Sequence, residues 1–152
     1  IERKFIKNKI LFFDNDIKNI ESSINILDEA GYEAFIASES DDFIELIRLS
    51  EPDLIILDIE TTAIIGRNML KELRNDSQYS NIPVILITGR DSVEERLTGL
   101  ELGADEYLIK PIISEELLMR VKNILTRISL NLEINSFTEA LSKQEKLAQK
   151  LH

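Results

Sequence analysis

Leu54-Ile55-Ile56-Leu57-Asp58 is a run of large apolar residues that stops abruptly at a carboxylate. Because the run is continuous rather than alternating, it is typical of a strand buried on both faces of a parallel sheet. Similar runs recur roughly 20 to 30 residues apart, the distance that a strand, a crossover helix and the next strand require. They occupy residues 10–13, 34–37, 84–87 and 107–109. The sequence therefore predicts parallel strands joined by helices.

The segments between these runs have helical periodicity and helical end signals. In the first, the apolar residues share one face and are followed by a capping glycine: Ile17, Ile20, Ile24, Leu27 and then Gly31. In the second, Ser40 or Asp41 is the candidate N-cap. Alternating strands and helices with right-handed crossovers give an open, doubly wound α/β sheet. We predict the flavodoxin-like (βα)5 arrangement with strand order 2-1-3-4-5.

The composition leaves few kinds of chemistry open. The chain has no cysteine and its single histidine is His152, which excludes thiol nucleophiles, serine–histidine triads and histidine or cysteine metal sites. A formal net charge of -10 disfavours binding of nucleic acid or anionic lipid by this fragment. No apolar run is long enough to span a bilayer, and no secretory leader is visible, so we expect a cytoplasmic protein. Carboxylate chemistry remains.

Polar residues end four of the predicted strands: Asp14, Asp58, Thr88 and Lys110. The carboxyl ends of parallel strands form the ligand-binding edge of an open sheet, so we expect these side chains to converge there. Neighbouring carboxylates repel each other unless a cation lies between them, and an all-oxygen ligand set favours Mg²⁺. A carboxylate that attacks a phosphoryl donor, while a metal ion and a lysine neutralise the transition state, forms an aspartyl phosphate.

Four stretches around these residues resemble the receiver domains of two-component response regulators, the CheY-like domains. They cover residues 10–16, 53–58, 84–89 and 103–111, and the last reads Gly-Ala-Asp-Glu-Tyr-Leu-Ile-Lys-Pro. The resemblance implies a signalling domain, not an enzyme in the usual sense, that takes its phosphoryl group from a histidine kinase or a phosphotransfer protein. In the family the Lys-Pro bond is commonly cis.

The resemblance also implies a role for individual residues. Asp58 is implied as the phosphoacceptor, Lys110 as the partner of the phosphate, Thr88 as the switch hydroxyl and Tyr107 as the aromatic residue whose exposure changes on activation. The metal ion is implied to be Mg²⁺ or Mn²⁺, and its ligands are expected to come from four residues: Asp14, Asn15, Asp58 and the backbone carbonyl of Glu60.

The sequence departs from the family pattern near the metal. Asn15 stands where most members have a second acidic residue, so the affinity for Mg²⁺ is expected to be lower. The loop after Asp58 lacks the Met-Pro pair that the family often has, and we expect Glu60 and Arg90 to form an ion pair over the phosphate. These departures leave open a pseudo-receiver, a dimerisation module that works without phosphorylation.

The run Asp14-Asn15-Asp16 also fits the haloacid dehalogenase-like phosphatases. Under that alternative, Asp14 is the nucleophile and Asp16 the acid/base. The alternative leaves Asp58 without a role, and no convincing further acidic metal motif follows Lys110.

The last two dozen residues contain neither proline nor glycine and are expected to prolong the fifth helix. Spacings of four and three alternate along them, as in a coiled-coil seam: Leu130, Ile134, Phe137, Leu141, Gln144, Ala148 and Leu151. We predict a receiver domain over residues 1–128 and a helical extension over 129–152 that pairs in parallel with a second copy and leads to an output domain. A helix that folds back onto its own domain is the alternative.

Overall fold

The computed structural model describes residues 8–13, 17–37, 42–58, 63–89 and 93–150. Within these residues, strands and helices alternate along the chain. The strands are β1 (Lys9–Phe13), β2 (Glu33–Ala37), β3 (Leu54–Asp58), β4 (Val84–Thr88) and β5 (Glu106–Ile109). The helices are α1 (Ile17–Glu29), α2 (Phe43–Ser50), α3 (Ala63–Asn75), α4 (Val93–Glu101) and α5 (Ser114–Lys150).

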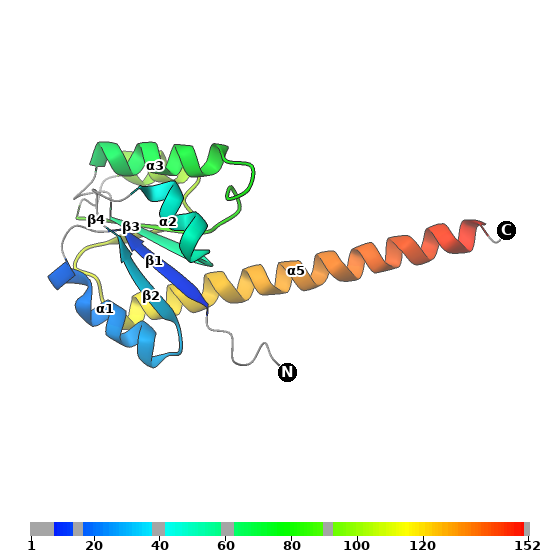
Figure 1. Cartoon of the computed structure of the whole chain (residues 1–152), viewed down its shortest axis with the longest axis horizontal. Helices are drawn as coiled ribbons and strands as arrows, with labels where there is room; N and C mark the ends of the chain where they lie inside the picture. Colours follow the sequence, from blue (N-terminus) through cyan, green and yellow to red (C-terminus); the bar gives the residue numbers. More distant parts are fainter. Residues whose placement is uncertain (1–7, 14–16, 38–41, 59–62, 90–92, 151–152) are drawn as a thin grey trace. The chain divides into compact units, whose positions relative to one another are not determined.

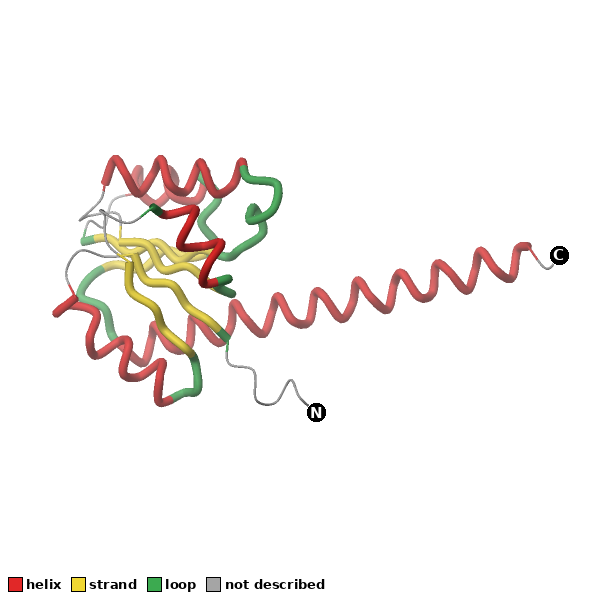
Figure 2. The backbone as a smooth tube through the Cα atoms, in the orientation of Figure 1, coloured by secondary structure: helices red, strands yellow, loops and turns green. Residues whose placement is uncertain are grey.

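The strands form one parallel sheet in the order β2-β1-β3-β4-β5. Helices α2 and α3 lie on one face of this sheet and α1 lies on the other, as the ribbon and the tube both show (Figure 1, Figure 2). In the register of the sheet, Asp58 of β3 is the partner of Ile87, and Thr88 of β4 is the partner of Ile109. The predicted flavodoxin-like fold and its strand order are confirmed.

The three central strands are buried almost throughout, as their continuous apolar runs predicted. β3 and β4 are buried at every residue and β1 at every residue after Lys9, whereas the edge strands β2 and β5 are only partly buried. On the face covered by α2 and α3, the rings of Phe13 and Phe43 meet edge to face with their centroids 5.7 Å apart. Each fully buried large apolar side chain stabilises the fold by about 2 kcal/mol.

The helix ends follow local rules, with one difference from the prediction. Gly31 and Gly103 have φ of 96° and 100° after α1 and α4, in the region that favours glycine at a C-terminal cap. The N-cap of α2 is Asp42, not Ser40 or Asp41, because α2 begins at Phe43. The Asp42 carboxylate accepts a hydrogen bond from the backbone N–H of Glu45 at 3.2 Å.

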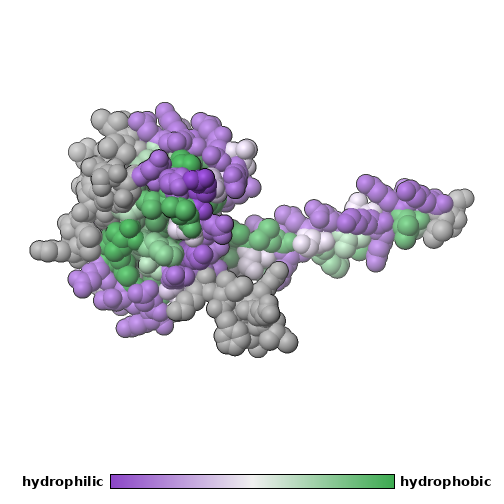
Figure 3. Space-filling model, viewed as in Figure 1, coloured by the Kyte–Doolittle hydropathy of each residue, from purple (hydrophilic) through white to green (hydrophobic). Residues whose placement is uncertain are grey.

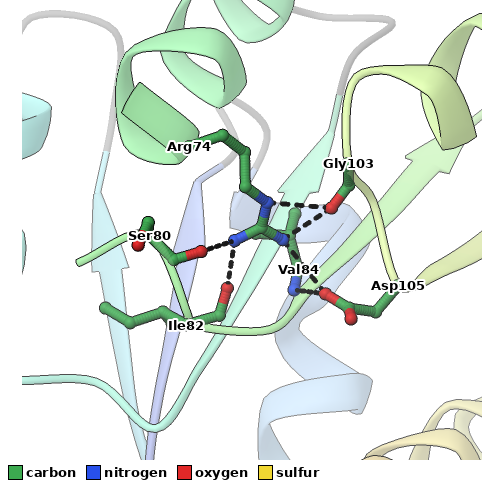
Figure 4. Close-up of polar contacts among 6 residues, drawn as sticks. All are labelled: Arg74, Ser80, Ile82, Val84, Gly103 and Asp105. Carbon is green, nitrogen blue, oxygen red and sulfur yellow. Dashed lines mark hydrogen bonds and ion pairs between the residues drawn. The ribbon is translucent and has the colours of Figure 1, made fainter. Parts of the chain in front are cut away.

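Arg74, in the last turn of α3, joins three segments at the amino-terminal edge of β4 and β5 (Figure 4). Its guanidinium donates to the carbonyl of Gly103 at 2.9 and 2.6 Å, and to the carbonyls of Ser80 and Ile82 at 3.0 and 2.6 Å. It also lies 3.0 Å from the carboxylate of Asp105, which accepts from the N–H of Val84 at 2.8 Å. This network holds the start of β4 beside the start of β5.

Helix α5 is continuous from Ser114 to Lys150, so the predicted extension of the fifth helix is confirmed. The chain divides into two compact units, Ile1–Arg120 and Val121–His152. In the second unit, every described side chain from residue 129 onward is exposed, and hydrophobic surface recurs along the helix (Figure 3). No helix in the described part of the chain is long and apolar enough to cross a membrane.

Candidate functional site

Asp58 is a buried carboxylate at the carboxyl end of β3. It is 2% exposed, and its Oδ2 lies 2.6 Å from Nζ of Lys110 in an ion pair. A carboxylate removed from water is costly unless a charge or hydrogen bonds compensate it. The sheet places this compensation close by, because Lys110 directly follows β5. A buried aspartate held beside an ammonium group suits a nucleophile that must later carry additional negative charge.

Thr88 ends β4, the strand between Asp58 and Lys110, and is 2% exposed. Its backbone carbonyl accepts a hydrogen bond from the N–H of Lys110 at 2.7 Å, which continues the pairing of β4 and β5 beyond Ile109. The Lys110–Pro111 peptide bond is cis. Three of the predicted strand-end residues therefore lie at one edge of the sheet, on three neighbouring strands.

The other predicted site residues lie outside the described residues: Asp14, Asn15, Asp16, Glu60 and Arg90. The predicted Glu60–Arg90 ion pair falls there too. Phe13, which precedes Asp14, is the sheet partner of Leu57, which precedes Asp58.

The metal prediction rests partly on residues outside the described ones. In the described ranges no three histidine, cysteine, aspartate or glutamate side chains are grouped as a metal site. The carboxylate of Asp58 does suit Mg²⁺, a hard cation that takes oxygen ligands and often uses only one or two carboxylates from the protein.

Tyr107, the predicted switch aromatic, lies in β5 and is half-buried, with Leu86 of β4 as its sheet partner. Its ring packs against the apolar core and against the backbone of α4 at Gly99. Gly99 was not singled out from the sequence. A signal was present, because an isolated glycine inside a helical pattern usually has a packing reason. Arg74 was also missed, and its carbonyl partners carry no sequence signal.

Residues 10–122 match the family model of the response regulator receiver domain. The chain belongs to this family. Its curated relatives include Response regulator MprA of Mycobacterium sp. (strain KMS), 37% identical over 121 residues, and Probable transcriptional regulator ycf27 of Cyanophora paradoxa, 36% identical over 124 residues. Each match covers 80% of this chain but only 52% and 49% of the relative, so the receiver chain spans about half the length of the relatives it matches.

Solved receiver structures agree with this assignment. A CheY-like receiver domain protein from Methanospirillum hungatei JF-1 is 27% identical with a TM-score of 0.73, and the match covers 83% of this chain and 99% of that one. The Francisella response regulator 1452 receiver domain is 33% identical with a TM-score of 0.69, covering 80% and 99%. Membership of the receiver family leaves no support for the haloacid dehalogenase-like alternative.

Proposed function

We propose that Asp58 accepts a phosphoryl group from a phosphohistidine of a histidine kinase or of a phosphotransfer protein. The observation that carries this proposal is the 2.6 Å ion pair between Asp58 and Lys110 at the edge where β3, β4 and β5 end. The carboxylate of Asp58 is the nucleophile, and a lone pair on one of its oxygens forms the bond to phosphorus. The bond from phosphorus to the donor imidazole nitrogen breaks, and that nitrogen keeps the electron pair.

Lys110 and Thr88 stabilise the added charge in this proposal. The ammonium group of Lys110 already lies beside the carboxylate, so a small movement pairs it with a phosphoryl oxygen as a point charge. Thr88 ends the neighbouring strand, and its hydroxyl can donate a hydrogen bond to another oxygen. The ammonium group of Lys110 lies beside Asp58 before the reaction, which supports the proposal because it reduces the reorganisation that phosphoryl transfer requires.

We also propose that the site binds Mg²⁺ or Mn²⁺ through four residues: Asp14, Asn15, Asp58 and the backbone carbonyl of Glu60. The support within the described residues is the carboxylate of Asp58. When bound, the ion would supply positive charge that offsets the charge on the phosphoryl oxygens. The neutral amide of Asn15 makes a lower affinity for the ion the expected consequence.

The output of this reaction is proposed to be a population shift. Thr88 moves toward the phosphoryl group, Tyr107 changes its exposure, and helices α4 and α5 change their positions. The receiver then passes its state through α5 to an output domain. The absence of cysteine and the phosphoryl chemistry both suit a cytoplasmic location.

The helix beyond residue 129 is proposed to pair in parallel with a second copy of the chain. Four apolar residues spaced by four, three and four support this: Leu130, Ile134, Phe137 and Leu141 are 53%, 60%, 67% and 45% exposed. Exposed apolar residues at this spacing are stabilised when two helices bury them in one seam. The geometry of such a dimer would carry the state of the receiver to its output domain.

The phosphoacceptor proposal is tested by intact-mass analysis after incubation with Mg²⁺ and acetyl phosphate. The parent chain should gain one phosphoryl group, and Asp58→Asn should gain none. Asp53→Asn is the matched control, because Asp53 precedes the same strand at its opposite end, where it accepts a hydrogen bond from the N–H of Lys9 at 2.7 Å. This control should be labelled like the parent.

Two results would contradict the proposal. Labelling that survives in Asp58→Asn would mean that another residue is the nucleophile. A parent chain that stays unlabelled with acetyl phosphate, and with a phosphorylated histidine donor, would favour the phosphorylation-independent pseudo-receiver.

A further inference from the structure

Gly99 is a buried glycine inside α4, at the point where this helix meets the sheet. A Cβ atom on Gly99 would lie 2.9 Å from Cδ1 of Leu86, and 3.3 and 3.4 Å from Cδ2 and Cε2 of Tyr107. The first distance is shorter than carbon atoms tolerate, and the other two are tighter than ordinary contacts. Residue 99 can therefore lie this close to Leu86 and Tyr107, with neither side chain displaced, because it has no side chain of its own.

The two contacted side chains differ in their freedom to move. Leu86 is 2% exposed within the core, so it has little room to retreat. Tyr107 is half-buried and lines a surface cavity of about 490 Å³ together with Leu100, Leu108 and Arg120. Because Leu86 cannot retreat, a side chain added at residue 99 would push α4 away from the sheet and loosen the packing of α4 over the ring of Tyr107.

We propose that Gly99 is a positioning residue for Tyr107, and that its missing side chain is what admits the ring beneath α4. The packing of the half-buried ring then depends on the position of the α4 backbone, so a movement of α4 would change the exposure of the ring. The regulatory meaning of this inference rests on the proposed function, in which Thr88 connects Asp58 with Tyr107. Thr88 follows Leu86 by two residues on β4, so both side chains lie on the same face of the strand.

The direction in which Gly99→Ala changes the Tm distinguishes this role from that of an ordinary helix position. In an ordinary helix interior, alanine in place of glycine stabilises the protein. If Gly99 positions Tyr107, Gly99→Ala should instead lower the Tm, by about 3 °C or more, and expose the ring. Glu101→Ala is the control, because residue 101 lies on the same helix and is exposed.

Ring exposure is measured by nitrating the unphosphorylated full chain with tetranitromethane and mapping the modified tyrosines by mass spectrometry. Tyr32 and Tyr79 are also half-buried and serve as references within each molecule. Relative to them, Tyr107 should be nitrated severalfold faster in Gly99→Ala than in the parent, and at the parental rate in Glu101→Ala. A stabilised Gly99→Ala protein with parental nitration of Tyr107 would overturn the inference.

A second variant keeps the test decisive if Gly99→Ala does not fold. Tyr107→Ala removes the ring against which a Cβ atom on residue 99 would press, so Gly99→Ala should lower the Tm less in that background than in the parent. Equal losses of Tm in the two backgrounds would overturn the inference. Both the Tm and the nitration of Tyr107 are measured without phosphorylation. Failure of the parent to be labelled on Asp58 would therefore reject the proposed function without affecting the test of Gly99.

Discussion

Nζ of Lys110 lies 2.6 Å from Oδ2 of Asp58, although the two residues belong to segments 52 positions apart. The Asp58 side chain is 2% exposed and the Lys110 side chain 23% exposed, so the pair is shielded from water mainly on the carboxylate side. Removing one member of a buried pair leaves the other charge uncompensated, which costs more than the pair itself contributes.

This relationship predicts strong coupling between the two residues in stability. Lys110→Met removes the ammonium group and should lower the free energy of unfolding by about 2 kcal/mol, less than for a fully buried pair because Lys110 is partly exposed. In an Asp58→Asn background the same substitution should cost much less, since no charge is left unpaired. Urea denaturation of the four proteins measures the difference. Purely additive costs would show that the pair contributes no coupling.

Lys110→Met should also slow phosphorylation of Asp58 by acetyl phosphate, because the ammonium group is positioned to offset the charge of the phosphoryl oxygens. Labelling is followed by intact mass over time, at a temperature where the variant is folded. Lys110→Arg keeps the charge but not its compact geometry, so it should recover the rate only in part. An unchanged rate in Lys110→Met would remove Lys110 from the proposed mechanism.

Arg74 should be important for stability but not for phosphorylation. Burial lowers the pKa of its guanidinium, and the nearby carboxylate of Asp105 opposes that shift. Arg74→Ala leaves the carbonyls of Gly103, Ser80 and Ile82 without this donor, and we expect a loss of about 3 kcal/mol in the free energy of unfolding.

The matched control for Arg74 is Arg48→Ala. The side chain of Arg48 is 62% exposed, and it pairs with Glu45 one turn earlier on α2. Exposed pairs of this kind contribute little, so urea denaturation should show a nearly unchanged midpoint. Equal midpoints for the two variants would refute a structural role for Arg74.

The cap of α2 predicts a smaller effect. Asp42→Ala removes the acceptor for the N–H of Glu45 and should lower the free energy of unfolding by about 1 kcal/mol. Asp42→Asn keeps an oxygen acceptor at the same place, so it should retain most of the stability. If both variants lose the same amount, the carboxylate contributes through its charge and not through the cap.

The proposed parallel dimer can be tested with introduced thiols, because the chain has no cysteine of its own. In a parallel, in-register coiled coil, Ile134 faces its own copy, so Ile134→Cys should form a disulfide-linked dimer under mild oxidation. Lys143→Cys places the thiol on the outer face of the helix and should remain largely monomeric in denaturing electrophoresis.

An antiparallel pairing of the same seam would give a different result. Residue 134 would then lie opposite residue 144 or 151, at least about 15 Å from its own copy along the helix. Sedimentation that shows a dimer without the Ile134→Cys crosslink would therefore indicate the antiparallel arrangement, and a monomer at all concentrations would reject the seam.

Local sequence patterns were enough to predict the elements of this fold and the positions of three polar residues at the strand ends. Continuous apolar runs predicted the buried strands, and the polar residues that end them predicted the edge at which Asp58, Thr88 and Lys110 lie together. This succeeds because burial on both faces and the common direction of parallel strands are expressed in local patterns. The length of α5 follows for the same reason, since a helix without proline or glycine has no local cause to end.

Contacts between groups that are far apart in the sequence could be identified only from the folded protein. Arg74 binds the carbonyl of Gly103, 29 residues away, and Gly99 of α4 leaves room for Leu86 of β4 and for the ring of Tyr107 of β5. Neither contact can be predicted from a periodic pattern in the sequence. Every residue has a backbone carbonyl, and a glycine in a helix does not indicate which side chain will pack against it. The close approach of packed elements sets these contacts, and it exists only once the chain is folded.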